Sequence, residues 1–162
     1  MARADNSKDL RPAELDEVDR RILSALHADA RISNSALADA VGVAPSTCHG
    51  RVRRLQDLGV IRGFYADIDP AAIGLPLQAM VSVSLQANAR GKIGRFIQQI
   101  RSRPQVIDVY FLAGADDFII HVAARDTDHL RSFVVDNLNA DADVAGTQTS
   151  LIFEHLRGAA PL

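Results

Sequence analysis

The sequence predicts an α+β protein with two domains: an N-terminal helix-turn-helix domain and a C-terminal ferredoxin-like βαββαβ domain. Residues 15–61 carry apolar side chains at helical spacing on both sides of an abrupt glycine turn. Residues 77–156 change between strand and helix periods in the order βαββαβ. The segment 62–76, with its prolines and glycine, separates the two patterns as a linker strand and hinge. An arm at 1–14 and a tail at 157–162 complete this organisation.

Composition allows a packed core and excludes several classes of protein. Of the 162 residues, 48% are hydrophobic, and no apolar run approaches the roughly 18 residues needed to span a membrane. The arm at 1–14 has no apolar core of the signal-peptide kind and is predicted to be solvated and disordered. Cys48 is the one cysteine, which excludes a disulfide within the chain. We therefore expect a reducing, cytoplasmic location.

Positive charge is concentrated in one short element. The formal net charge is −2, which by itself argues against a nucleic-acid binder. Residues 44–62 nevertheless hold Arg51, Arg53, Arg54 and Arg62 against a single acidic residue, Asp57. A local basic patch of this kind is typical of a DNA-binding surface.

Three short helices are predicted before residue 60. The first spans about 16–26, with apolar residues at helical spacing. Ser33 is predicted to cap the second helix, and Gly42 to form a turn that needs a positive φ. Pro45 suits the first position of the third helix, which Gly59 ends. Two helices separated by such a turn form a helix-turn-helix.

The third helix has a sharply divided surface. Cys48, Val52 and Leu55 form its apolar stripe, in which Cys48 is predicted to be a buried hydrophobe rather than a redox sensor. The rest of the surface fits a helix in the major groove, where arginine binds guanine edges or phosphates through paired hydrogen bonds. The predicted DNA-contacting residues are Ser46, Thr47, His49, Arg51, Arg53 and Arg54. Two alternatives stay open: the arginines are a solvated helix face, or Arg51 pairs with an acidic residue of the same domain, such as Asp19.

Periodicity also places the elements of the second domain. Strands are predicted at 77–85, 106–113, 117–124 and 144–154, and helices at 92–103 and 127–138. Ile107, Val109 and Phe111 are expected to face the helices, and Tyr110 and Leu112 to lie on the opposite face. An apolar sheet face that the helices leave open is typical of an interface. We therefore expect a homodimer with its sheets packed face to face.

The assembled residues resemble the Lrp/AsnC family, also called feast/famine regulatory proteins. The resemblance covers nearly everything from Leu15 to Glu154 and keeps the order of both domains. The matching segments are Leu15-Asp16-Glu17-Val18-Asp19, Ile22-Leu23, Leu26, Asp29-Ala30-Arg31-Ile32-Ser33, Leu37-Ala38, Val41-Gly42-Val43, Arg51-Val52-Arg53-Arg54-Leu55, Gly59-Val60-Ile61, Asp69-Pro70, Gly74 and Gly114-Ala115-Asp116-Asp117-Phe118.

This resemblance implies that the helix-turn-helix domain is of the winged-helix type. It also implies a transcriptional regulator that responds to an amino acid or a related metabolite, with no catalytic residues, no metal and no cofactor. Family members form dimers that often assemble into tetramers or octamers, and the effector typically sits between subunits. Backbone N–H groups of the loop at 114–117 would hold the effector's carboxylate, and an Asp its ammonium. The implied effector-binding residues are Gly114, Ala115, Asp116, Asp117, Thr127, Thr149 and Ser150.

Two residues depart from the family pattern. Ala44 stands where the family commonly has Ser or Thr, so the third helix lacks an N-cap oxygen worth about 1 kcal/mol. Ala115 occupies a loop position that is often polar in relatives, so a side-chain bond to an effector is lost there.

Other interpretations remain open at this stage. Asp116 and Asp117 could form only a hairpin turn, or a paired-carboxylate active site, although no Ser, Cys or His constellation accompanies them. The whole chain could be an architectural DNA-binding protein without an effector, or a small ferredoxin-like metabolic enzyme subunit. The arginine-rich third helix argues against the enzyme. The modest total charge argues against a general DNA packager.

Overall fold

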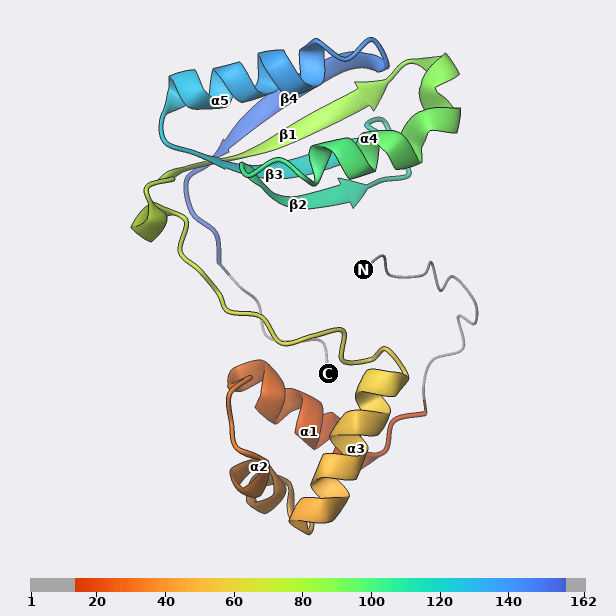
Figure 1. The fold of residues 1–162 in the computed structure, drawn as a ribbon, viewed down its shortest axis with the longest axis vertical. Helices are drawn as coiled ribbons and strands as arrows, with labels where there is room; N and C mark the ends of the chain where they lie inside the picture. The colour runs from red at the N-terminus through yellow and green to blue at the C-terminus, as the bar shows by residue number, and fades with distance from the viewer. Residues whose placement is uncertain (1–13, 157–162) are drawn as a thin grey trace. The chain divides into compact units, whose positions relative to one another are not determined.

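The computed structural model describes residues 14–156, apart from the side chain of Arg90. Almost all of the predicted arm and the whole of the predicted tail lie outside the described residues. The described chain forms two compact units, and the boundary along the sequence falls between Asp67 and Ile68. The first unit holds three helices, α1 (Glu17–Ala28), α2 (Asn34–Val41) and α3 (Pro45–Asp57) (Figure 1).

Local signals begin and end these helices as the sequence predicts. The Ser33 hydroxyl accepts a hydrogen bond from the Ala36 N–H at the start of α2, and Gly42 ends that helix with a φ of 73°. A left-handed φ strongly favours glycine. Pro45 lies in the first turn of α3, and Ala44 provides no side-chain cap. The sharp turn of the helix-turn-helix thus follows directly from local sequence.

The first unit has its own small core. Its buried side chains come from all three helices and are at most 2% exposed: Ile22, Leu37, Ala38, Val41, Cys48 and Leu55. Cys48 belongs to this core, as predicted, and burial raises the pKa of its thiol. The core faces of α1, α2 and α3 therefore leave the opposite face of α3 to solvent.

The linker strand predicted between the two domains does not form. Residues 58–76 contain no strand, and a three-residue turn at Ala71–Ile73 is their one short helical element. A strand requires a hydrogen-bonded neighbour, and none of the described strands pairs with this segment. Its large side chains are exposed, 46% for Phe64 and 75% for Tyr65. The helix-turn-helix accordingly has no β-wing among residues 14–76.

The second unit is a four-stranded antiparallel sheet with two helices, in the predicted βαββαβ order. Its strands are β1 (Leu77–Leu85), β2 (Val106–Phe111), β3 (Phe118–Ala124) and β4 (Val144–Ile152). They lie in the order β2-β3-β1-β4. The helices are α4 (Ile93–Ile100) and α5 (Thr127–Val134), the latter continued by a π-helical turn at Val135–Asn139. Figure 1 shows both helices beside the sheet.

A β-bulge in β2 changes the expected position of one residue, Ile107, and leaves the predicted faces of Val109, Tyr110 and Phe111 as they were. Val106 pairs with Val122 and Asp108 pairs with His121, so Ile107 is the extra residue. Because a bulge shifts the alternation of side chains by one residue, Val106 and Val109 pack on the core. Ile107 was expected to face the helices, but it is 43% exposed.

The helices cover one face of the sheet and leave the other open. The core between them includes Val81 and Val83 of β1, Phe118 and Ile120 of β3, Phe96 of α4 and Leu130 of α5. On the open face Met80 pairs with His121 and Ser150, and Tyr110 pairs with Ile119. This face therefore mixes apolar and polar side chains, and Tyr110 is 47% exposed.

Candidate nucleic-acid interface and effector loop

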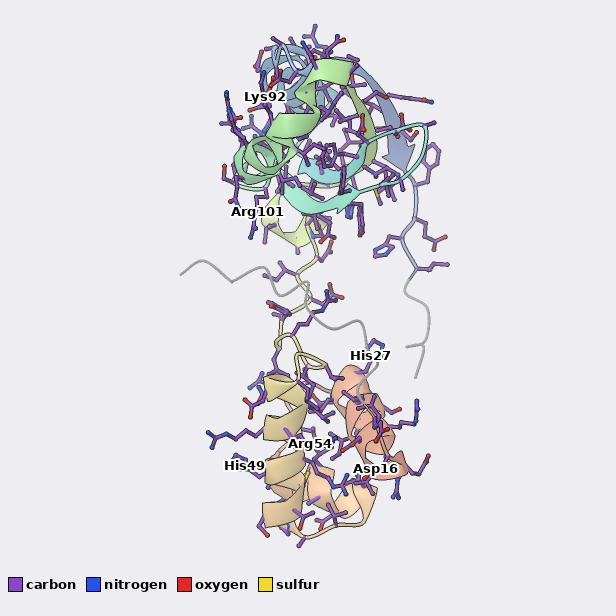
Figure 2. All side chains as sticks on the ribbon, turned by 90° about the vertical axis from the view of Figure 1, so that its right-hand side faces the viewer. Asp16, His27, His49, Arg54, Lys92 and Arg101 are labelled. Carbon is purple, nitrogen blue, oxygen red and sulfur yellow. The ribbon has the colours of Figure 1, made fainter. Side chains whose placement is uncertain are left out.

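The face of α3 that points away from the core carries most of the predicted DNA contacts. Ser46, Thr47, His49 and Arg53 are all exposed. In Figure 2 His49 projects from α3 on the side away from α1, whereas Arg54 lies on the side toward Asp16. None of these four side chains makes an ion pair within the described part of the chain. They form what we call the reading face: Ser46, Thr47, His49 and Arg53.

Two other arginines of α3 are held by carboxylates from the start of α1. Arg51 donates to Asp16 at 2.5 Å and to Asp19 at 2.9 Å. Arg54 donates to the other oxygen of Asp19, also at 2.9 Å, and to the Glu14 carbonyl at 3.2 Å. The sequence left open whether Arg51 pairs with Asp19, and this pairing is present. That Arg54 shares the same carboxylate was not predicted.

The helix cap of α1 builds this cluster. Asp16 accepts a hydrogen bond from the Asp19 N–H, and the Asp19 side chain accepts one from the Asp16 N–H, which is a capping box. The Asp19 side chain is 1% exposed, while Asp16 is 53% exposed. The hydrogen bond from the Asp19 N–H, together with Arg51, lowers the pKa of Asp16. The same ion pairs raise the pKa of Arg51 above its ordinary value.

An open hollow of about 390 Å³ lies over the cluster. Three carboxylates and two guanidinium groups line it, together with Thr47 and Gly50: Glu14, Asp16, Asp19, Arg51 and Arg54. The acidic groups outnumber the basic ones, so the hollow offers no excess positive charge to a phosphate. This distinguishes it from the reading face, where Arg53 is unopposed among the described residues.

The predicted effector loop is tied to the end of β1. The Leu85 N–H donates to the Asp117 carboxylate at 2.7 Å, and the Ser84 hydroxyl donates to Asp116 at 3.1 Å. The Asp117 N–H donates to the Val83 carbonyl at 3.0 Å. Both carboxylates therefore have structural partners that the sequence did not reveal. Gly114 and Ala115 are exposed beside them.

A single chain does not bring the predicted effector residues together. The loop at 114–117 lies at the Leu85 end of β1, whereas Thr127 follows β3 at the Leu77 end. The nine residues of β1 separate these ends by roughly 26 Å, at about 3.3 Å per residue. Thr149 and Ser150 alternate along β4, so their side chains point to opposite faces of the sheet. A common site would require a second copy of the chain.

The open sheet face also holds a nearly buried histidine that the sequence analysis did not single out. His121 is 7% exposed, its Nε2 lies 3.0 Å from the Gln78 Oε1, and its Nδ1 lies 3.9 Å from Asp108. Burial lowers the pKa of His121, against the opposing effect of the Asp108 carboxylate. The partners of His121 come from the two strands beside β3, Gln78 from β1 and Asp108 from β2.

Other kinds of site find no support in the described chain. Among residues 14–156 no cluster of three or more His, Cys, Asp or Glu side chains could hold a metal ion. Within the same part of the chain, no helix combines the length and the apolarity that a membrane crossing needs.

Comparison with known proteins agrees with both halves of this structure. Residues 15–56 match the AsnC-type helix-turn-helix domain, and residues 78–160 match the Lrp/AsnC ligand binding domain. A DNA-binding helix-turn-helix followed by a ligand-binding domain defines a transcriptional regulator. The chain belongs to the Lrp/AsnC family of these regulators, as its sequence resemblance implied.

Individual relatives are similar over almost the whole chain. The HTH-type transcriptional regulator AldR of Mycobacterium tuberculosis is 82% identical over 99% of this chain and 89% of its own length. The crystal structure of the M. tuberculosis AldR has a TM-score of 0.80 and covers 93% of this chain and 100% of that one. A Neisseria meningitidis transcriptional regulator, solved as a complex with L-Met, is 29% identical with a TM-score of 0.82, covering 91% and 96%. These relatives are regulators, so the enzyme interpretation is set aside.

Proposed function

We propose that this regulator recognises specific DNA sequences through the reading face of α3, and that an amino acid bound at its second domain changes this recognition. The proposal of DNA recognition depends on one observation, which is that the polar side chains of α3 fall into two sets. Ser46, Thr47, His49 and Arg53 face solvent without an acidic partner among the described residues, whereas Arg51 and Arg54 are each held by a carboxylate of α1. A short polar surface with one unopposed arginine fits the major groove, where base edges offer hydrogen-bond partners.

The proposal of an amino-acid effector depends on the loop at 114–117 and on a relative that was solved with an amino acid bound. The Neisseria meningitidis regulator of similar fold was solved with L-Met. In this chain the loop at 114–117 is anchored to β1 by Asp116 and Asp117, which leaves Gly114 and Ala115 exposed to a ligand. Backbone N–H groups at such a loop can bind a carboxylate. We therefore propose an α-amino acid as the effector, with its carboxylate at Gly114 and Ala115.

We propose a homodimer as the smallest working assembly, with further assembly to tetramers or octamers. Thr127 and the loop at 114–117 lie at opposite ends of one sheet, so one chain cannot surround an effector with both. The open face of the sheet exposes Tyr110 and partly exposes Met80 and Ile119. Such a face gains free energy when a second copy covers it. As a regulator of transcription, the assembly would act where the cell's DNA lies, in the cytoplasm.

Two linked measurements test this proposal. A library of randomised duplexes is first enriched on the full-length protein, and the recovered sequences are aligned. A thermal-shift screen of the common amino acids follows, and DNA affinity is remeasured with each stabilising amino acid. We expect a two-fold symmetric consensus and at least one amino acid that changes affinity, since linkage requires the effect to be reciprocal. Enrichment without a consensus would instead favour an architectural DNA-binding protein, and an absence of any stabilising amino acid would contradict the effector.

A further inference from the structure

Asp19 is a buried charge that serves two arginines of the DNA-reading helix. Each of its oxygens accepts from one guanidinium, Oδ1 from Arg51 and Oδ2 from Arg54, both at 2.9 Å. Its side chain is 1% exposed, whereas Arg51 is 29% and Arg54 is 49% exposed. The carboxylate is thus fixed inside the domain, and the two arginines reach inward to it from the surface of α3.

The cluster removes positive charge from the surface that would meet DNA. Arg51 is neutralised by Asp16 and Asp19, and Arg54 by Asp19. Phosphate contacts made by arginine strengthen binding to every DNA sequence equally, because they carry no base information. A guanidinium held by a carboxylate at 2.9 Å has its charge offset and fewer N–H groups left to donate to a phosphate. Of the arginines within α3, Arg53 alone among described residues has no acidic partner.

We propose that Asp19 is a specificity-determining positioning residue: it holds Arg51 and Arg54 away from the DNA backbone, and so limits sequence-independent binding in favour of the reading face. This inference rests on the proposed DNA recognition by α3. It goes further because Asp19, a residue of α1, would influence DNA binding only through the arginines that it holds, without touching DNA itself. Asp16 assists through Arg51 alone.

A purely structural brace between α1 and α3 is the competing interpretation, and the two differ in measurable ways. If Asp19 only supports the fold, its replacement weakens all DNA binding in parallel with stability. If Asp19 restrains the arginines, its replacement frees Arg54 and leaves Arg51 held by Asp16 alone. Each freed arginine that contacts a phosphate steepens the dependence of log affinity on log salt by about 0.9 and strengthens shuffled-sequence binding roughly tenfold at 0.1 M salt.

The experiment compares full-length wild type with Asp19→Asn, which keeps the size of the side chain and removes its charge. Fluorescence anisotropy measures affinity for two duplexes, one enriched from a randomised library by the wild-type protein and one of the same composition in shuffled order. Asp57→Asn is the matched control, because it removes an exposed carboxylate from α3 without releasing an arginine. Arg51→Gln with Arg54→Gln, added to Asp19→Asn, tests whether the freed arginines cause the effect.

We expect Asp19→Asn to bind the shuffled duplex about tenfold more tightly, with a steeper salt dependence and a lower ratio of specific to shuffled affinity. The added arginine substitutions should reverse this, and Asp57→Asn should leave the ratio unchanged. An unchanged ratio in folded Asp19→Asn, or equal weakening on both duplexes, would overturn the proposal. If circular dichroism shows that Asp19→Asn does not fold, Arg54→Gln takes its place. Because the proposal holds Arg54 away from the DNA backbone, Arg54→Gln should leave the salt dependence unchanged on both duplexes, and a shallower salt dependence overturns the proposal. If the wild type enriches no sequence, the proposed recognition fails, yet the salt dependence on shuffled DNA still tests Asp19.

Discussion

Asp19 of α1 and Arg54 of α3 lie 35 positions apart in the sequence and meet at 2.9 Å in the folded domain. The carboxylate is buried and the guanidinium is half exposed, so the pair joins the start of the first helix to the outer side of the third. Arg51 completes the arrangement through the second Asp19 oxygen. The orientation of α3 is therefore coupled to a buried acidic residue of α1.

Replacing Arg54 should destabilise the first domain. In Arg54→Ala the Asp19 carboxylate keeps Arg51 but loses a charged hydrogen-bond donor in a buried position. We expect the free energy of unfolding to fall by about 1–3 kcal/mol. Arg53→Ala is the matched control on the same helix and should change it by less than about 0.5 kcal/mol. Urea denaturation followed by circular dichroism compares the two, and equal losses would contradict the assignment of Arg54 to the ion-pair cluster.

A cap added to α3 should stabilise the protein. Ala44 adopts the extended conformation of an N-cap but has no oxygen to accept a hydrogen bond from the first turn of α3. Ala44→Ser supplies one, and we expect a gain of about 0.5–1 kcal/mol. Ser33→Ala removes the corresponding bond from α2 and should cost a similar amount. A loss of stability in Ala44→Ser would show that this position is constrained by something other than capping.

Acidification should weaken the second domain through His121. The pKa of this imidazole is lowered in the fold from its ordinary value of 6.5, chiefly by burial. The unfolded chain therefore binds more protons below pH about 6.5 than the folded chain does. Neutral His121 therefore makes its full contribution to the free energy of unfolding above pH about 6.5. That contribution declines as the pH falls from 6.5 toward the lower pKa of the folded state. We expect His121→Gln to lose less stability between pH 7.5 and pH 5.5 than wild type, and an identical loss would count against this source.

The two functions of Asp117 should be separable by substitution. Asp117→Ala leaves the Leu85 N–H without its acceptor, which we expect to cost about 1–3 kcal/mol. Asp117→Asn retains an acceptor oxygen and should preserve most of the stability. If the carboxylate also binds an effector's ammonium group, Asp117→Asn should lose amino-acid stabilisation in a thermal-shift assay while remaining folded. If Asp117→Asn retained all of that stabilisation, Asp117 would have only its structural contact with Leu85 and would not bind the effector.

Local chemistry made much of the fold predictable from sequence. The alternation of Val81 and Val83 with Ser82 and Ser84 predicts β1 with both of its ends, because a half-buried strand repeats every two residues. Ser33 and Gly42 mark the two ends of α2 through a side-chain cap and a left-handed φ. These signals act within a few residues, so they can be recognised without knowledge of the tertiary structure.

The features that escaped prediction depend on contacts between distant segments. The bulge at Ile107 is defined by the pairing of β2 with β3, and it leaves this residue outside the alternation of the strand. The segment around Phe64 and Tyr65 has the composition of a strand but no strand beside it within the described chain. The sequence suggested Asp19 as a partner for Arg51, but not that the same carboxylate also holds Arg54. The charges along α3 do not by themselves distinguish Arg51 and Arg54, which a carboxylate of α1 holds, from Arg53, which has no acidic partner among the described residues.

The most direct test of the central claim is the DNA affinity of Arg53→Ala. Arg53 is the exposed arginine of the reading face that lacks an acidic partner among the described residues. Anisotropy titrations on the enriched duplex should show a loss of affinity of about tenfold or more. The slope of log affinity against log salt should be reduced by about one if the contact is to phosphate. Unchanged affinity in a fully folded Arg53→Ala protein would contradict DNA recognition by the outer face of α3.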